Sequence, residues 1–534
     1  MSDSSQGRKG WLARWIERRF GGYRHDFNQP DPERPVKLEQ PRRVAVVGAG
    51  IAGMGAAAKL GERGFSVVLL ERNDYLGGKL GAWKTTMADG RQIGMSHGFH
   101  AFFHHYYNLN TFLAEIGVAG HYRNIGDYLI LTRDGRRYSF AKVATTPLLN
   151  LLSLARNGVY SFREVAGRHT GPKMEALLRY DPVATFAEWD QVSYEQFAAD
   201  ARLPASLRLV FNTFSRAFFS DPDKMSMAEL IKSFHFYYLS NDGGLIYDYL
   251  DDDFEPALLA PLREHMQRCG VEIRTGCPVE RIDYDSEGEG VVIGDERFDY
   301  LVLASDVVAT REIFGRSPTL AAALPQTAAK VETLRPGQRY SVWRLWLDRD
   351  FDAVAEGLPG FIITEGEVLL DALTFVDVVE GESRRWVEER RAAGAAGCVI
   401  ELHCYAVPET LADGAVDEAG QQVVREAFLR ELRHFFPMLA DAPVVHDEFY
   451  LRRDFPAFHV GMHATRPSWD TELANVFLAG DWVSLPLPAM LMEAAYSAGL
   501  LAANAIFRRE QLREEQVYSV PPRGFMADMR RRKL

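Results

Sequence analysis

Hydrophobic residues near the start of the folded chain form two short runs that flank a helical segment. The sequence from residue 43 reads RVAVVGAGIAGMGAAAKLGERGFSVVLLERN. An apolar, β-branched run from Val44 to Val47 enters a glycine-rich turn, and an alanine-rich helix follows. A second apolar run, Ser66 to Leu70, ends at an acidic residue. This order predicts strand, turn, helix and strand, which is the first unit of a doubly wound α/β fold.

The turn carries the spacing GxGxxG, formed by Gly48, Gly50 and Gly53. The first glycine permits a tight turn, the second permits close approach of a pyrophosphate, and the third permits the helix to pack on the strand. The amides at the start of the helix, at Ile51 and Ala52, can then hold phosphates. An acidic residue at the end of the second strand stands where a ribose is bound. Together these features predict a dinucleotide-binding domain.

A second glycine pair follows in NDYLGGKLGAW, where Gly77 and Gly78 precede Lys79. Two adjacent glycines let the backbone approach a second stretch of diphosphate, and a cation there offsets its charge. The segment resembles the glycine pair of the amine-oxidase and carotenoid-desaturase superfamily of FAD enzymes. In that superfamily the pair lies beneath the flavin, so the resemblance implies FAD rather than NAD.

Two later segments resemble the same superfamily. The first is GVEIRTGCPVERIDYD followed by ERFDYLVLASDVVAT, and the second is NVFLAGDWVSLPLPAMLMEAAYSAGLLAANAIF. The resemblance implies that the backbone near Val279 meets the adenine and that the strand ending at Ala304 rejoins the FAD sheet. It also implies that Asp481, after Gly480, binds the ribityl or phosphate region. The helix that follows directs its N-terminus at the flavin, where it stabilises negative charge.

The resemblance implies an α/β fold class, with a Rossmann-like FAD-binding domain of the amine-oxidase type and an interleaved α+β substrate domain. We expect noncovalent FAD, because no histidine or cysteine stands in a recognised flavin-attachment context. The expected divisions are 1–42 for a basic helix and linker, 43–110, 243–310 and 471–508 for the FAD-binding domain, 111–242 and 311–470 for the substrate and membrane-facing domain, and 509–534 for a basic tail. The residues expected to bind FAD are Gly48, Gly50, Ile51, Ala52, Gly53, Glu71, Arg72, Gly77, Gly78, Lys79, Met95, Ser96, Val279, Ala304, Gly480, Asp481, Met490 and Met492.

The intervening segments show helical patterning with large apolar residues, including ATTPLLNLLSLARNG and FNTFSRAFFSDPDKMSMAELIKSFHFYYL. The alternation in RYSVWRLWLDRDF predicts a strand in a sheet that faces the flavin. Most of these apolar residues are expected to form the core.

Four histidines crowd the stretch GMSHGFHAFFHHYYNLN, which spans residues 94–110. A metal site would need ligands that converge, but Gly98 breaks a helix and the stretch holds no acidic or thiol ligand, so no metal is expected. The remaining interpretations are structural histidines bonded to backbone groups and histidines that contact substrate or handle a proton. His97 and His100 are the leading candidates for the second role, because the superfamily passes this strand along the flavin.

The same stretch resembles the bacterial β-carotene desaturase/methyltransferase group, of the isorenieratene-synthase type, as does PAMLMEAAYSAG. His104 and His105 depart from the expected pattern, so the particular substrate stays open. The resemblance implies an apolar isoprenoid substrate, desaturated by hydride transfer to flavin N5, with aromatic side chains beside a developing cation. A soluble-amine oxidase, a reduced-flavin polyene isomerase and a catalytically inactive lipid-binding homologue are the alternatives. The electron acceptor (quinone or oxygen) and the oligomeric state are not specified by the sequence.

The composition and net charge of the chain limit the classes of partner and metal centre that we expect. The chain has 534 residues with a formal net charge of −12, which argues against nucleic acid because phosphate binding needs a basic face. Its four cysteines show no CxxC spacing, which argues against zinc ribbons and iron–sulfur domains and favours a reducing compartment. No apolar run approaches the roughly 20 residues of a membrane span.

The N-terminal segment GRKGWLARWIERRFGGYRH predicts a basic amphipathic helix whose apolar face holds Leu12, Trp15, Ile16 and Phe20. Such a helix is typical of a lipid interface, and the alternative is packing on the protein's own body. The run PLLNLLSL is a second candidate for membrane contact, with burial as its alternative. The basic run Arg530 to Lys533 could add to membrane attraction. We therefore expect a cytoplasmic enzyme held peripherally at the inner face of a membrane.

Overall fold

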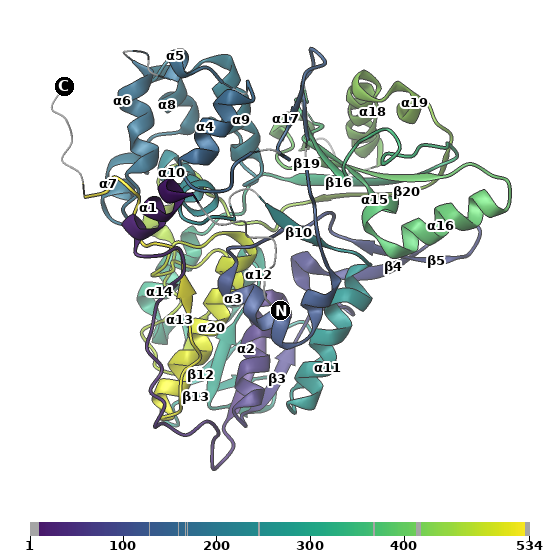
Figure 1. Ribbon diagram of the computed structural model, residues 1–534. Helices are drawn as coiled ribbons and strands as arrows, with labels where there is room; N and C mark the ends of the chain where they lie inside the picture. The colour runs from purple at the N-terminus through teal and green to yellow at the C-terminus, as the bar shows by residue number, and fades with distance from the viewer. Residues whose placement is uncertain are drawn as a thin grey trace.

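The computed structural model describes residues 10–528, apart from Tyr128, Lys142, Val159, Ala166, Arg168 and residues 244–245, 367–368 and 413–417. The basic run Arg530 to Lys533 lies outside the described residues. Figure 1 shows three regions: a sheet with its helices at the bottom, a helical region at the upper left, and a larger sheet with its helices at the upper right.

A five-stranded parallel sheet forms the centre of the lower region, in the order β11-β3-β2-β15-β21. Its strands are β2 (Arg43–Val47), β3 (Ser66–Leu70), β11 (Glu272–Arg274), β15 (Tyr300–Leu303) and β21 (Val476–Leu478). The central strands are buried along almost their whole length, as expected for parallel strands covered on both faces. The predicted α/β fold is confirmed, and three segments far apart in the sequence form one sheet.

Two helices, α2 (Ile51–Glu62) and α20 (Leu491–Arg509), pack against each other on this sheet (Figure 1). Small residues set their close approach. A Cβ at Gly55 would lie 2.6 Å from the Tyr496 ring, and a Cβ at Gly499 would meet the backbone of α2. Because the two helices pack this closely, the relative position of their N-terminal ends is fixed.

The larger sheet has seven strands in the order β20-β16-β19-β18-β17-β8-β9. These strands are β8 (Leu129–Leu131), β9 (Arg137–Ser139), β16 (Tyr340–Leu347), β17 (Phe361–Thr364), β18 (Ala372–Phe375), β19 (Cys398–Cys404) and β20 (Val444–Arg452). The strand predicted from RYSVWRLWL is β16, and all eight of its residues are buried. Trp343 and Leu345 face the core beneath α18 (Glu418–Phe435), whereas Tyr340 and Val342 face the other side.

Helices dominate the third region. They include α4 (Leu149–Arg156), α7 (Ala184–Trp189), α8 (Tyr194–Asp200), α9 (Ala205–Arg216), α10 (Met227–Phe234) and η4 (His235–Leu239), and α5 (Phe162–Val165) and α6 (Thr170–Met174) lie in the same region (Figure 1). The run PLLNLLSL ends within α4, where Leu154 is buried and Asn150 donates to the Tyr238 carbonyl at 2.6 Å. Leu148, Leu149 and Leu151 are partly buried and Leu152 is 44% exposed, so the run packs on the protein body in part and keeps one apolar side chain at the surface.

The N-terminal helix α1 (Trp11–Phe20) combines the two interpretations of its sequence. Ile16 is buried, and the Phe20 ring lies 5.6 Å from the Phe525 ring, so one side packs on the protein body. Trp11 is 72% exposed and Trp15 47% exposed, so the other side offers tryptophans to the surroundings. Within the described part of the chain, no helix combines the length and apolar character needed to cross a bilayer.

Short elements complete the fold. The other strands are β1 (His25–Asp26), β4 (Ala82–Thr86), β5 (Gln92–Ser96), β6 (Phe102–Phe103), β7 (Tyr122–Asn124), β10 (Tyr247–Leu250), β12 (Asp283–Asp285), β13 (Gly290–Ile293), β14 (Glu296–Phe298) and β22 (Tyr518–Ser519). The other helices are η1 (Gly78–Leu80), α3 (Tyr107–Glu115), η2 (Val118–His121), η3 (Glu175–Leu178), η5 (Glu255–Leu259), α11 (Ala260–Arg268), α12 (Val307–Arg316), α13 (Pro318–Ala323), α14 (Pro325–Thr333), α15 (Val376–Val379), α16 (Gly381–Ala392), α17 (Glu409–Ala412), α19 (Pro437–Ala440) and η6 (His463–Thr465).

Candidate active site

A cavity of about 460 Å³ lies where the three regions meet. Its lining divides into two parts by chemistry. One part, the cofactor half, is lined by the glycine-rich turns and the polar residues that follow the strands of the parallel sheet. The other part, the aromatic half, is lined by aromatic side chains from the helical region and the larger sheet. The two halves are continuous, so a bound cofactor and a substrate can share this space.

The two glycine motifs meet in the cofactor half. Gly50 pairs with Gly77 in a parallel bridge, and the Gly77 amide donates to the Ala49 carbonyl at 2.8 Å. Gly48 has φ +103° and Gly77 has φ +107°, a backbone region that favours glycine. A Cβ at Gly50 would have no protein atom within 4 Å, so this position opens into the cavity. The turns therefore leave the backbone bare where a phosphate can approach the N-terminus of α2.

Glu71 closes the end of β3 and is buried. Its carboxylate accepts hydrogen bonds from the Ala49 amide at 2.8 Å and the Asn73 amide at 2.9 Å. The side chain therefore fixes the glycine turn, while it also lines the cavity together with Val279. Each carboxylate oxygen can accept a further bond, so the geometry is compatible with ribose binding.

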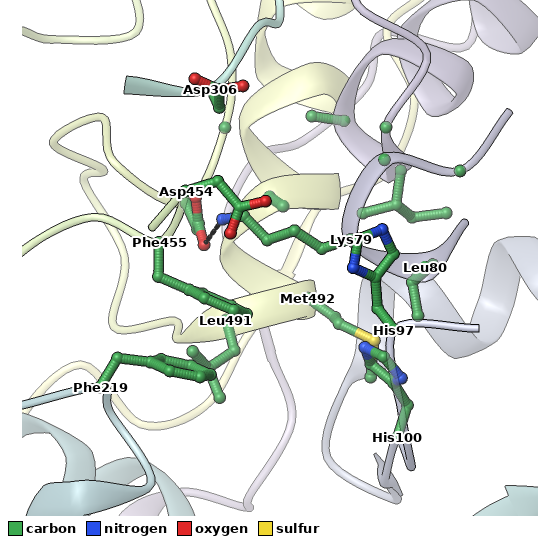
Figure 2. A pocket seen from close by; sticks show the side chains of 18 of the residues that line it. Lys79, Leu80, His97, His100, Phe219, Asp306, Asp454, Phe455, Leu491 and Met492 are labelled. Carbon is green, nitrogen blue, oxygen red and sulfur yellow. Dashed lines mark hydrogen bonds and ion pairs between the residues drawn. The ribbon is translucent and has the colours of Figure 1, made fainter. Parts of the chain in front are cut away.

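Lys79 and Asp481 form an ion pair of 2.9 Å between Nζ and Oδ2 in the cofactor half. The same ammonium lies 4.3 Å from the centroid of the Phe455 ring. Figure 2 shows Lys79 beside the start of α20, where Leu491 and Met492 border the cavity. The N-termini of α2 and α20 thus open onto one cavity, which favours a ligand with negative charge at both places.

Most of the residues expected to bind FAD line this cavity, and four do not: Gly53, Met95, Ser96 and Met490. A Cβ at Gly53 would meet the Gly48 carbonyl, so this glycine serves helix packing. Met95 packs in a core cluster with Trp346. The Ser96 hydroxyl lies 3.3 Å from Arg344, and Met490 is buried in the main core. Each of these four residues packs against other parts of the protein and not against the cavity.

The four histidines of the sequence cluster do not converge. His97 and His100 line the cavity, and Figure 2 shows them on the side of Met492 opposite Phe219 and Phe455. His104 instead pairs with Asp248 at 3.1 Å and is 42% exposed. Among the described residues, the group of three side chains that could share a metal ion is Glu62, His265 and Cys269, which includes none of the four histidines.

His105 is buried in an aromatic cluster and lies outside the cavity lining. Its ring centroid is 4.6 Å from that of Phe236, and burial lowers its pKa to about 3. It is a core residue, so the sequence cluster mixes two cavity residues with one core residue and one surface residue.

Burial keeps the two cavity histidines of this stretch neutral. Burial, followed by the charges of Arg452, His100 and Lys79, lowers the pKa of His97 to about 3. The Tyr340 hydroxyl lies 3.4 Å from Nδ1 of His97. Burial also lowers the pKa of His100 to about 4, and its Nδ1 donates to the Gly98 carbonyl at 2.7 Å. Both side chains are therefore polar but uncharged parts of the wall at neutral pH.

The aromatic half comes from segments that are distant in sequence. Phe219 and Phe455 stack with centroids 3.5 Å apart, and Phe99 stacks with Phe361 at 4.7 Å. The aromatic lining residues are Phe99, Phe103, Tyr106, Phe140, Phe218, Phe219, Tyr237, Tyr238, Tyr247, Tyr340, Phe361, Tyr405 and Phe455. Sequence reasoning predicted an aromatic wall only near residues 94–110. The other contributors carry no local signal, because aromatic residues at such spacings are usually core.

A buried charge network lies behind this wall. Arg344, which has no exposed surface, is 2.6 Å from Glu380 and 2.8 Å from Glu401. Glu401 in turn lies 3.2 Å from His403, and His403 lines the cavity. Two features of the sequence could have indicated this network. One is the arginine inside the apolar run RYSVWRLWL, and the other is the placement of Glu401 and His403 two residues apart in the apolar run CVIELHC.

Comparison with known proteins agrees with this geometry. Residues 51–507 match the model of the flavin containing amine oxidoreductase family. The chain therefore belongs to this family and is an FAD-dependent oxidoreductase, as the sequence resemblance implied. Carotenoid phi-ring synthase from Streptomyces griseus is 36% identical over 96% of this chain and 97% of its own length. Zeta-carotene desaturase from Synechocystis is 23% identical over 88% of this chain and 98% of its own length.

Solved structures share the fold. A putrescine oxidase structure has a TM-score of 0.62 at 14% identity and covers 88% of this chain and 100% of its own. Cyclohexylamine oxidase from Brevibacterium oxydans has a TM-score of 0.61 at 18% identity and covers 88% of this chain and 99% of its own. At these identities the likeness concerns the fold alone.

Proposed function

We propose that the protein desaturates an end ring of a carotenoid and converts a β-type ring into an aromatic ring with a methyl shift. The observation that carries this proposal is the aromatic half of the cavity, which is apolar and continuous with the cofactor half. A polyene end ring fits such a space because aryl faces bury apolar surface and stabilise positive charge. The carotenoid phi-ring synthase relative supports the same substrate class.

We propose that FAD lies in the cofactor half. The N-terminus of α2 and the paired glycine turns would hold its pyrophosphate, and Glu71 would accept from its ribose. Val279 would border the adenine, while Asp481 and the start of α20 would hold the ribityl chain and the pyrimidine edge. The bare backbone at Gly50 and the two helix N-termini at one cavity support this fit.

Bound FAD supplies a hydride acceptor for a C–H bond that an ordinary base cannot ionise. The chain's own residues then do three things. The stacked pairs of aromatic rings orient the ring and exclude water from the cation left after hydride loss. Their π faces stabilise that cation, which gives the methyl group time to move. The neutral state of His97 and His100 avoids placing a positive charge next to it.

The distribution of acids disfavours the soluble-amine alternative. The carboxylates that line the described cavity, Glu71, Asp306, Asp454 and Asp481, belong to its cofactor half. An ammonium substrate in the aromatic half would meet no lining carboxylate. Arg344 of β16 is not available to a substrate in the cavity, because its guanidinium is held in buried ion pairs with Glu380 and Glu401.

We also propose that the enzyme works at a membrane surface, because a carotenoid is too apolar to diffuse through water. The exposed tryptophans of α1 stand beside Arg14, Arg18 and Arg19, which suits an anionic lipid interface. The buried face of α1 would keep this membrane-contacting helix packed against the rest of the protein.

The test is turnover of β-carotene in liposomes by the purified FAD protein, with oxygen or a quinone as acceptor and products identified by mass spectrometry. We expect a loss of four hydrogens for each ring converted, and an aromatic product in the absorption spectrum. A product of unchanged mass would indicate an isomerase and overturn the proposal. Oxidation of soluble amines with no carotenoid product would overturn it in favour of the amine oxidase.

A further inference from the structure

His403 lies at the end of the buried charge network and at the wall of the aromatic half. The register of the sheet produces this arrangement, because β16 and β19 pair Arg344 with Glu401 and Val342 with His403. His403 Nε2 is 3.2 Å from Glu401 Oε1 and 3.0 Å from Thr374 Oγ1. Its ring therefore reaches from the ion pair to the cavity.

The network selects one tautomer of His403. Although burial acts to raise it, the Arg344 guanidinium and the hydrogen bond from His403 hold the pKa of Glu401 down, at about 2. An ionised carboxylate only accepts hydrogen bonds, so Nε2 of His403 must carry the proton. Nδ1 then keeps its lone pair, and it lies 3.4 Å from the Cβ position of Gly98. This places the basic nitrogen at the segment that runs between His97 and His100.

Three histidines line the described cavity, and they differ in their partners. His97 faces Arg452 and Lys79, whose charges oppose its protonation. His100 uses its Nδ1 on the Gly98 carbonyl. His403 alone among the three has a carboxylate within hydrogen-bond distance of its ring. Tyr405 lies beside it with ring centroids 6.1 Å apart, and contributes no charge of its own at neutral pH.

We propose that His403 is the base that completes the ring desaturation, with Nδ1 as the accepting atom and Glu401 and Arg344 as positioning residues. The inference rests on the proposed function. After hydride leaves the ring with its electron pair for FAD, the ring carries a positive charge. A C–H bond next to the cationic carbon breaks, its electrons form the C=C bond, and the proton binds Nδ1. The resulting imidazolium stands against the Glu401 carboxylate, as a catalytic histidine does against its orienting acid.

The electrostatics of the network favour this proton. Arg344 faces two carboxylates, Glu380 and Glu401, so the three groups carry one more acid than base. The imidazolium that forms when His403 accepts the proton therefore stands 3.2 Å from one of these carboxylates, that of Glu401. The cavity wall around Gly98 thus combines two kinds of group, the neutral side chains of His97 and His100 and a proton acceptor at His403.

The decisive variants are His403→Gln and His403→Ala, with His104→Gln as the control on the surface. Glutamine keeps a donor toward Glu401 but offers no base, so we expect product formation to fall about 100-fold or more at unchanged FAD content. In His403→Ala, added imidazole should restore a measurable part of the rate, because it can enter the cavity and accept the proton. His104→Gln should behave as the wild type, with and without imidazole.

A positioning role for Glu401 predicts a different pattern. Glu401→Gln should lower kcat about 10-fold with KM for β-carotene unchanged, since the charge that favours the imidazolium is lost while the cavity keeps its shape. His403→Gln at the wild-type rate, in a wild-type preparation that forms the aromatic product, would overturn the assignment of the base and leave the proposed function standing. Failure of imidazole to act on an FAD-loaded His403→Ala would also overturn it. A wild-type protein that forms no desaturated product would overturn both proposals.

Discussion

The cofactor half of the cavity combines bare backbone with a few polar side chains, whereas the aromatic half is formed by aromatic side chains. In the first, Gly50 and Gly77 leave peptide groups bare and α2 directs its free amides inward. In the second, stacked rings such as Phe219 and Phe455 and a buried ion-pair network form the wall. A phosphate can be bound by backbone amides, which every residue except proline has. The sequence therefore needs only correctly spaced glycines, which leave these amides exposed. A polyene is recognised by apolar area, which can come from any part of the chain.

The difference explains why the two halves tolerate change differently. In the cofactor half, we expect one side chain added at Gly50 to block the approach of a phosphate. In the aromatic half, many rings contribute to substrate contact, so the loss of one ring should have a small effect. Substitution of the polar groups buried behind the rings should have a larger effect. The following experiments test this contrast.

Gly50→Val should produce the largest effect, a protein that retains little FAD. The new side chain would project into the open space where a pyrophosphate approaches. FAD content per chain is measured from the absorbance of the released flavin. Gly315→Val, at an exposed position of α12, is the control and should keep its FAD. Normal FAD content in Gly50→Val would show that this turn is not the phosphate site.

Arg344→Met should destabilise the fold by about 3–5 kcal/mol, because it leaves Glu380 and Glu401 buried without a cation. Chemical denaturation of the FAD protein measures the change. Arg433→Met, which breaks an exposed pair with Asp441, is the matched control and should cost no more than about 1 kcal/mol. Equal losses in the two variants would mean that the network does not hold the aromatic half together.

Replacing His97 or His100 by Phe should lower turnover about 10-fold with a smaller change in stability, because both line the cavity and neither is charged. Initial rates and melting temperatures of the same preparations give the comparison. His105→Phe should show the reverse, since His105 belongs to an aromatic core cluster. A large loss of stability at normal specific activity would make His97 and His100 structural residues.

Asp481→Ala should weaken FAD binding about five-fold and leave the fold intact. The change removes a carboxylate that we propose accepts a hydrogen bond from the ribityl chain, and the loss of such a bond costs about 1 kcal/mol. The dissociation constant is obtained by titrating FAD into the apoprotein. An unchanged constant would remove Asp481 from the cofactor half.

The smallest effect is expected at the molecular surface. Trp11→Ser with Trp15→Ser should reduce sedimentation with anionic liposomes about two-fold and leave FAD content unchanged, because both side chains are exposed. Val183→Ser, at another exposed apolar position, is the control. Equal sedimentation of the double variant and the wild type would show that α1 is not the membrane contact.

The histidine-rich stretch at residues 94–110 contains site residues that could be predicted from the sequence and others that could not. The family resemblance indicated His97 and His100 as pocket residues, and both line the cavity. Spacing could not separate them from His104 and His105, because the chain turns from β6 into α3 within this segment. It also could not indicate His403, which is about three hundred residues away in sequence and reaches the same wall through the pairing of β19 with β16.

The residues themselves predicted the first strand, turn, helix and strand and the dinucleotide-binding glycine turns, and the family resemblance added FAD and the later strands of the sheet. The first group depends on neighbouring residues: apolar runs select buried strands, and glycine spacing selects a turn that exposes amides. The three-dimensional packing was needed to identify which aromatic rings form the wall of the aromatic half, that Arg344 is held by two carboxylates, and that His403 lines the cavity. These depend on strand register and helix packing between distant segments, and the free energy of burying a ring or a charge is set by the partners that the fold brings to it.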